Sequence, residues 1–228
     1  MIQASIVTLL SPNEAAQRLG ITPRRVYALV RDNRLRAQRV GGRLLINRDD
    51  VDARVSGAPA VGRSFSPRRA WALVLLAVDE TPRGIDASTK SKLRRLLRDR
   101  DLWSMRGKLV DRAERRFLRA HSSDIARMEA EPDVVRTGAR CAAAAGLELI
   151  APDAPLELYV DHTTADRLIK RYRLTPNSQP NVVLRVVPDE VRAWLEGPLA
   201  PRPAIALDLA EDLDSRAQDV AHEALSRR

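Results

Sequence analysis

The polar and apolar positions near the start of the chain predict two short helices in close succession. Ser11 can cap a helix in which Glu14 completes a capping box, and Gly20 supplies the left-handed residue that commonly ends a helix. Thr22 can cap a second helix, which we expect to run to about Asn33. Because the connection between the helices is so short, they must cross sharply, which is the helix-turn-helix arrangement.

The second of these helices has one apolar and one basic side. At helical spacing, Val26 and Leu29 fall on the side that would face a core. Arg24 and Arg31 fall on the other side with the small Ala28 between them, so this side can enter a major groove about 12 Å wide. Arg25 and Tyr27 flank this basic side and complete the candidate recognition surface. An ordinary basic surface helix is the alternative to this interpretation.

A β-hairpin is predicted after the second helix. Two short runs within residues 35–46 are joined by Gly41-Gly42, and such a turn needs positive φ at both central residues. Asn47 can then cap a third short helix. The arginines of the hairpin are further candidate DNA-binding residues, the last two lying nearest the tip: Arg36, Arg39 and Arg43.

Helix, turn, helix, Gly-Gly hairpin and helix, in this order, resemble the excisionase and MerR-type winged-helix family over about 45 residues. The resemblance implies that residues 1–56 form a winged helix-turn-helix that binds double-stranded DNA. It assigns recognition-helix positions to Thr22, Arg24, Arg25, Tyr27 and Arg31, and wing positions to Arg39 and Arg43. Because one such module contacts few base pairs, we expect a homodimer or several copies on DNA, with half-sites about one helical turn apart.

The next part of the chain is predicted to be a linker followed by helices. Residues 57–66 are small and unpatterned, and we expect them to be the linker. A helical segment is expected over 67–133, with a buried helix at 71–78 and further helices at 88–100 and 106–120. No sustained heptad appears, so the long dimerising coiled coil of MerR regulators is not predicted. Whether the basic residues within this segment add DNA contacts stays open, and a solvated face is the favoured alternative.

The chain changes character from about residue 134 onward. Short β-type runs alternate with helical ones, which predicts a small α/β domain over 134–228. The strands are expected at 156–160 and 181–187, and the helical runs at 139–145, 165–172, 203–211 and 214–226. The fold class expected for the whole chain is therefore mainly α plus α/β.

Three stretches of this second half resemble AbiEi-type antitoxins. They are Val134–Gly138 with the alanine-rich run after it, Pro180–Pro188, and Ala206–Leu209. The resemblance implies a winged helix joined to an α/β domain, repression of the protein's own operon, and neutralisation of a nucleotidyltransferase-like toxin encoded beside it.

Charge is distributed unevenly along the chain. It holds 39 Lys and Arg against 30 Asp and Glu, a net charge of +9. Residues 1–54 carry +5, residues 55–140 carry +8, and residues 141–228 carry −4. This asymmetry indicates nucleic acid at one end and a different partner at the other, although an arginine-rich proteome is an alternative explanation.

Candidate catalytic or metal-binding groups do not assemble into a recognisable pattern. His121, His162 and His222 lie far apart and lack ligand spacing, and the single cysteine, Cys141, is expected to be buried. An acidic group around 208–214 is best explained as helix-end charges and a solvated turn. We therefore expect no enzyme activity, no metal and no cofactor.

Three functions fit these observations. The leading one is a DNA-binding transcriptional autorepressor that acts as antitoxin to a nucleotidyltransferase-like toxin. The alternatives are a ligand-responsive transcriptional regulator and an excisionase-like recombination directionality factor. Residues 1–10 lack a basic leader before a long apolar stretch, and no segment approaches the roughly 20 apolar residues of a membrane span, so a cytoplasmic location is expected.

Overall fold

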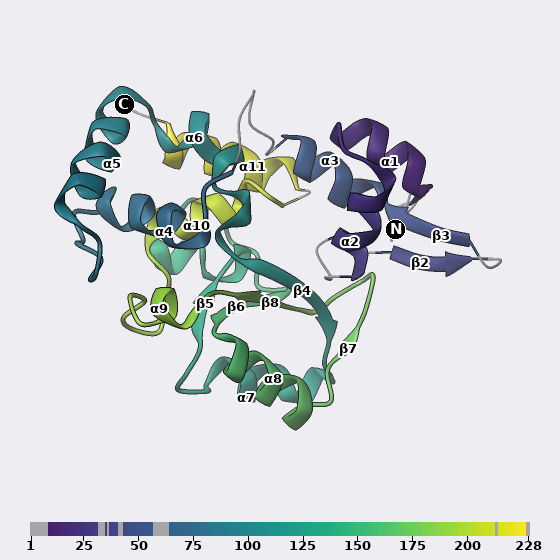
Figure 1. Ribbon diagram of the computed structural model, residues 1–228. Helices are drawn as coiled ribbons and strands as arrows, with labels where there is room; N and C mark the ends of the chain where they lie inside the picture. Colours follow the sequence, from purple (N-terminus) through teal and green to yellow (C-terminus); the bar gives the residue numbers. More distant parts are fainter. Residues whose placement is uncertain are drawn as a thin grey trace.

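The computed structural model describes residues 9–31, 35, 37–40, 43–56, 64–212 and 214–226. Within these ranges the chain forms an N-terminal winged-helix unit and a larger body built around a mixed sheet (Figure 1). The expected fold class, mainly α with an α/β part, is confirmed.

The first helix of the winged-helix unit has the caps that the sequence predicts at both of its ends. The elements of the unit are β1 (Leu9–Leu10), α1 (Pro12–Leu19), α2 (Pro23–Arg31), β2 (Ala37–Val40), β3 (Arg43–Asn47) and α3 (Arg48–Ser56). Ser11 Oγ accepts a hydrogen bond from the Glu14 amide at 3.3 Å, and the Glu14 carboxylate accepts one from the Ser11 amide at 2.7 Å. Gly20 follows with a φ of 65°, so the capping box and the left-handed end of α1 are both confirmed.

A separate small core holds this unit together. Among the described residues its strands pair antiparallel in the order β1-β3-β2, with Leu10 opposite Ile46. Val26 and Leu29 of α2 are fully buried against Ile46 and Val51. The turn residues Gly41 and Gly42 lie outside the described residues, as does most of the expected linker.

The body is built on a sheet whose described strands run in the order β5-β6-β8-β4-β7. These are β4 (Glu114–Arg119), β5 (Val135–Thr137), β6 (Leu156–Val160), β7 (Thr175–Pro176) and β8 (Val182–Val186). The central strands β6 and β8 are parallel, and α8 (His162–Arg171) lies in the connection between them. The other neighbours are antiparallel. The strands expected around 156–160 and 181–187 are confirmed.

Helices cover both faces of the sheet (Figure 1). One face packs against α8 and α7 (Ile125–Glu129), with Met128 and Leu168 in that core. The other face is covered by α4 (Pro67–Leu76), α10 (Arg202–Leu209) and α11 (Ser215–Leu225). The remaining helical elements are α5 (Ala87–Asp99), α6 (Leu102–Met105), α9 (Asp189–Arg192), η1 (Arg106–Lys108), η2 (Val110–Arg112), η3 (Ser122–Asp124), η4 (Ala139–Cys141) and η5 (Ala143–Ala145).

The helix expected over 106–120 is wrong. Its first half forms the short turns η1 and η2, and its second half is β4, which pairs with β8 and places Arg116 opposite Leu184. The arginines of β4 obscure the alternation of polar and apolar positions that is typical of a strand. A strand tolerates them because residues distant in sequence match their charges: Arg116 pairs with Asp166 of α8 at 3.0 Å. The run expected to be helical at 139–145 consists of the short 3-10 turns η4 and η5.

The body has a continuous structure across residue 134, where a new domain was expected to begin. Residues within 67–133 share a core with residues that follow 134. Trp71 of α4, for example, packs edge-on against Tyr159 of β6, with 4.9 Å between the ring centroids. The strand β4 also belongs to the same sheet as β5, β6 and β8. No helix in the described part of the chain is long and apolar enough to span a membrane.

Candidate DNA interface and the junction behind it

The recognition helix α2 presents the two sides that its sequence predicts. Val26 and Leu29 are buried, whereas Arg24 and Arg31 are exposed on the other side. Tyr27 is 52% exposed, which is unusual for so large a side chain with an apolar ring. The structure therefore leaves this side of α2 accessible for a groove.

Thr22 and Arg25 lie at the first turn of α2. The Thr22 hydroxyl accepts a hydrogen bond from the Arg25 amide at 3.3 Å, which satisfies one of the free donors at the helix start. The Arg25 side chain is exposed and lines a pocket together with Val110 and Asp111 of the body. A role for either residue in contacting DNA stays a prediction.

The wing is described only in part. Arg43 begins β3, opposite Val40 of β2, and its side chain is exposed. Arg39 pairs with Leu44 in the hairpin, but its side chain lies outside what the structure describes. Arg36 lies outside the described residues altogether. The wing contacts with DNA likewise stay a prediction.

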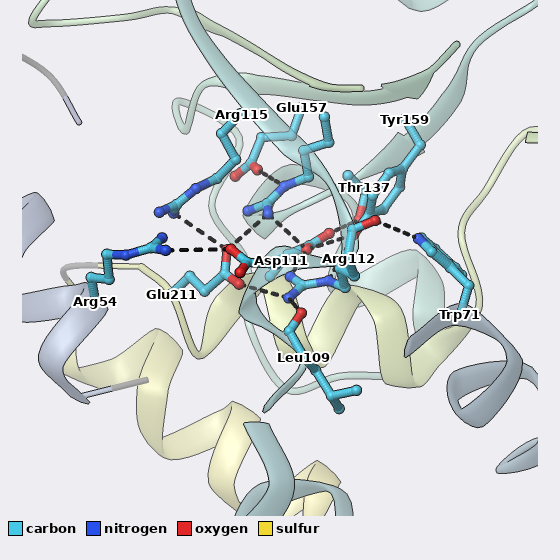
Figure 2. A network of polar contacts seen from close by, with 12 residues as sticks. Arg54, Trp71, Leu109, Asp111, Arg112, Arg115, Thr137, Glu157, Tyr159 and Glu211 are labelled. Atoms are coloured by element: carbon cyan, nitrogen blue, oxygen red, sulfur yellow. Dashed lines mark hydrogen bonds and ion pairs between the residues drawn. The ribbon is translucent and has the colours of Figure 1, made fainter. Parts of the chain in front are cut away.

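An ion pair joins the winged-helix unit to the body. Arg54, near the end of α3, contacts Asp111 of η2 at 3.3 Å between Nη2 and Oδ1. Ser64 donates a hydrogen bond from its hydroxyl to the other oxygen of Asp111 at 2.6 Å. These side chains are largely shielded from water, with Arg54 16% and Asp111 27% exposed. The junction thereby places α3 directly beside the body (Figure 2).

The residue after Asp111 is the centre of a buried ionic network (Figure 2). Arg112 is 1% exposed; it pairs with Asp208 of α10 and, at 2.6 Å, with Glu211. Its Nε donates to the Tyr159 hydroxyl at 3.2 Å, and that hydroxyl donates to Asp208 at 2.7 Å. The backbone oxygen of Arg112 accepts from the indole of Trp71 at 3.2 Å. A buried guanidinium is thus bonded on every side, as its desolvation requires.

Arg185 of β8 is the second buried cation of this network. It contacts Glu157 at 2.7 Å, Glu211 at 2.9 Å and Asp208 at 3.0 Å. Gly138 leaves room for Glu157, because a Cβ at that position would lie 2.5 Å from the carboxylate. Thr137 of β5 also donates a hydrogen bond to Asp208. The network therefore ties together strands β5, β6 and β8, the end of α10 and the segment before β4.

Burial and charge compete in setting the protonation of these groups. Burial by itself would raise the pKa of Glu211, but Arg112, Arg115 and Arg185 outweigh it and hold that pKa below its usual value. Burial likewise would lower the pKa of Arg112, and the facing carboxylates, with Glu211 foremost, raise it instead. For Glu157, burial dominates over Arg185 and the pKa is raised. Arg112 and Glu211 are therefore ionised partners at neutral pH.

The network corrects our interpretation of the acidic group near the end of the chain. Asp208 and Glu211 were expected to be helix-end charges in a solvated turn, yet both are buried against arginines. The exposed surface of residues 141–228 is consequently less acidic than their −4 suggests. One signal could have revealed the network: Arg185 stands alone inside the apolar run Val182–Val187.

The other side chains considered as candidate reactive groups cap a helix, pack against an aromatic ring or are buried. Asp161 caps α8 by accepting from the Thr164 amide at 2.6 Å, with His162 as the first residue of that helix. His222 packs against Trp103, with 4.6 Å between ring centroids. Cys141 is buried as expected, and burial raises the pKa of its thiol. In the ranges that the structure describes, no three His, Cys, Asp or Glu side chains lie together as a metal would require.

Comparison with known proteins assigns both parts of the chain. Residues 9–58 match a helix-turn-helix domain family, so the unit with the exposed basic helix belongs to a class of DNA-binding regulators. Residues 95–227 match the family described as a transcriptional regulator, the AbiEi antitoxin of a type IV toxin–antitoxin system. That second match spans more than half of the chain, and the chain belongs to this antitoxin family. Searches of curated proteins and of solved structures found no match.

The two family assignments define the protein as a DNA-binding transcriptional regulator and antitoxin. Both families are regulatory rather than enzymatic, and the antitoxin family implies a toxin as counterpart. The antitoxin match begins inside α5 and includes all strands of the body sheet and the helices α7 to α11.

Proposed function

We propose that this protein represses its own operon through the winged-helix unit and neutralises a nucleotidyltransferase-like toxin through its body. The antitoxin-family match over residues 95–227 is the observation that carries the proposal. It also favours the antitoxin over an excisionase-like factor, for which a body of this size has no evident use. The exposed basic side of α2, with Arg24 and Arg31, supports the repressor half.

The body acts on the toxin by binding it. Its buried carboxylates are occupied by arginines, so Asp208 and Glu211 are structural groups rather than free catalytic acids. A nucleotidyltransferase site handles phosphates and is therefore basic, and even a modestly acidic surface is drawn to it. Residues 141–228 carry −4 and residues 64–228 as a whole carry +3, so this attraction acts through the surface of residues 141–228.

Two or more copies of the protein bind the operator together. One winged helix contacts too few base pairs for useful genomic specificity. We expect protected half-sites about one helical turn, or 10–10.5 bp, apart or a multiple of that spacing. Footprinting at saturating protein concentration measures this, and a single protected half-site would contradict the arrangement.

Repression and neutralisation should separate in suitable variants. In cells that carry the toxin, the full chain with Arg24→Ala and Arg31→Ala together should still rescue growth but lose repression of an operator–reporter fusion. A fragment of residues 64–228, which keeps the Ser64–Asp111 contact and both cores of the body, should rescue equally. The physical reason is that the winged-helix unit has a core of its own.

Mixing the purified protein and toxin distinguishes between two ways of silencing the toxin. Direct binding predicts a stoichiometric complex on size-exclusion chromatography with no change in toxin mass. A covalent change in the toxin would instead indicate enzymatic silencing. If the 64–228 fragment is folded and neither binds nor rescues, the antitoxin half of the proposal fails while the repressor half is untouched.

A further inference from the structure

A pocket lies between the winged-helix unit and the body. It has a volume of about 250 Å³, slightly below the range of roughly 300–1,000 Å³ common for ligand sites. Its walls come from the C-terminal end of α1, from α2, from the end of α3, and from η1 and η2 of the body. Junctions between domains are among the places where ligand pockets occur most often.

The lining has an apolar part and a basic part. Leu19, Ile21 and Val55 of the winged-helix unit and Val110 of the body supply the apolar walls. Val55 is 42% exposed, so this apolar surface is incompletely covered by the protein itself. A ligand with an apolar portion would remove this surface from water. Each Å² of apolar surface buried in this way stabilises the bound state by roughly 25 cal/mol.

Among the described residues, Arg25 is the cation of this lining that lacks a carboxylate partner. Arg18 pairs with Asp52 at 3.2 Å, and Arg54 pairs with Asp111 at 3.3 Å. Asp111 also accepts the Ser64 hydroxyl, so its charge is already well satisfied. Arg25 has no carboxylate partner among the residues that the structure describes. The pocket therefore has a net positive wall next to an apolar one.

We propose that this pocket binds a small amphipathic anion, with its anionic group on Arg25 and its apolar portion between Leu19, Ile21, Val55 and Val110. The site is independent of the toxin. Its ligand also opposes DNA binding, because it occupies an arginine at the start of the recognition helix. That consequence, but not the site, rests on the proposed role of α2 in DNA binding.

Octanoate is a suitable probe, because it combines one carboxylate with a short apolar chain. Binding to the full chain is measured by protein-observed NMR titration, with octylammonium and butyrate as ligand controls. Octanoate should bind more tightly than either, because octylammonium reverses the charge and butyrate lacks most of the apolar contact. Equal binding of octylammonium would overturn the charge complementarity on which the site depends.

Variants locate the site. Arg25→Gln should weaken octanoate about tenfold, the loss expected for one charge-assisted contact, while Arg24→Gln, one residue away and outside the lining, should leave it unchanged. Val55→Trp should fill the cavity and block binding. If this variant fails to fold, Val110→Trp fills the cavity from the other wall. The comparison of Arg25→Gln with Arg24→Gln tests the site in either case. Equal octanoate affinities for Arg25→Gln and Arg24→Gln would overturn the proposal.

The effect on DNA is measured separately with the native chain and the Val55→Trp variant. Saturating octanoate should weaken operator binding several-fold in the native chain and have no effect in the variant. Binding of octanoate without any change in operator affinity would overturn the regulatory consequence and leave the site standing. Because octanoate binding is measured without DNA or toxin, failure of the site and failure of the proposed function are distinguishable.

Discussion

Replacing Arg112 with leucine should lower the free energy of unfolding of the body by about 3–5 kcal/mol. The substitution leaves Asp208 and Glu211 buried with one cation fewer, and an uncompensated buried carboxylate is costly. It also removes the donors to Tyr159 and to the Leu109 carbonyl. Urea denaturation followed through tryptophan fluorescence measures the change, because buried Trp71 donates to the backbone of Arg112.

Arg95→Leu is the matched control for this experiment. Arg95 pairs with Asp99 on the surface of α5 at 3.8 Å, and its side chain is 79% exposed. Exposed ion pairs of this kind contribute about 0–1 kcal/mol, so the control should be nearly as stable as the native protein. Similar stabilities for Arg112→Leu and Arg95→Leu would show that the buried network contributes little beyond a surface pair.

Operator binding should weaken by about 1–3 kcal/mol in Arg24→Ala and in Arg31→Ala, which is roughly 5- to 150-fold in Kd. Arginine contacts to base edges carry sequence information, so the preference for operator over scrambled DNA should shrink as well. Arg43→Ala on the wing should instead weaken all sequences evenly and reduce the dependence of affinity on salt. Fluorescence anisotropy at several salt concentrations measures each quantity.

The same titrations test the basic face of α5. Arg94 is exposed there, far along the chain from the recognition helix, and Arg94→Ala should bind operator with native affinity if that face is solvated. Unchanged affinity in both Arg24→Ala and Arg31→Ala would remove α2 as the recognition helix. A loss confined to Arg94→Ala would move the DNA contacts to the body.

The local features of this fold could be predicted because their causes lie within a few residues of one another. The capping box of Ser11, the cap at Asn47 and the left-handed Gly20 each depend on neighbours in sequence. The buried side of α2 followed from its helical period. These signals predicted the winged-helix unit and the longer helices of the body, but not the short helices α6, α7 and α9.

The strand β4 and the ionic network could not be predicted in this way. The arginines of β4 are compatible with a sheet because carboxylates from other elements reach them, as Asp166 reaches Arg116. Arg112 meets Asp208 across a separation of 96 residues. Nothing near Arg112 in sequence indicates that it is buried. Pairings at this distance are a property of the completed fold, and the pocket at the junction of the two units is another.

The large separation in sequence between Arg112 and Asp208 affects the order in which the protein folds during synthesis on the ribosome. The winged-helix unit has a local core and can fold as soon as its residues emerge, since domains fold as units beginning at the N-terminus. The body must wait for α10 and α11, which complete the core that α4 begins. Each nascent chain therefore acquires its operator-binding part before its antitoxin part. Under the proposed repression of its own operon, a translation product interrupted before α10 would occupy the operator without protecting the cell, and would hold back new antitoxin while doing so.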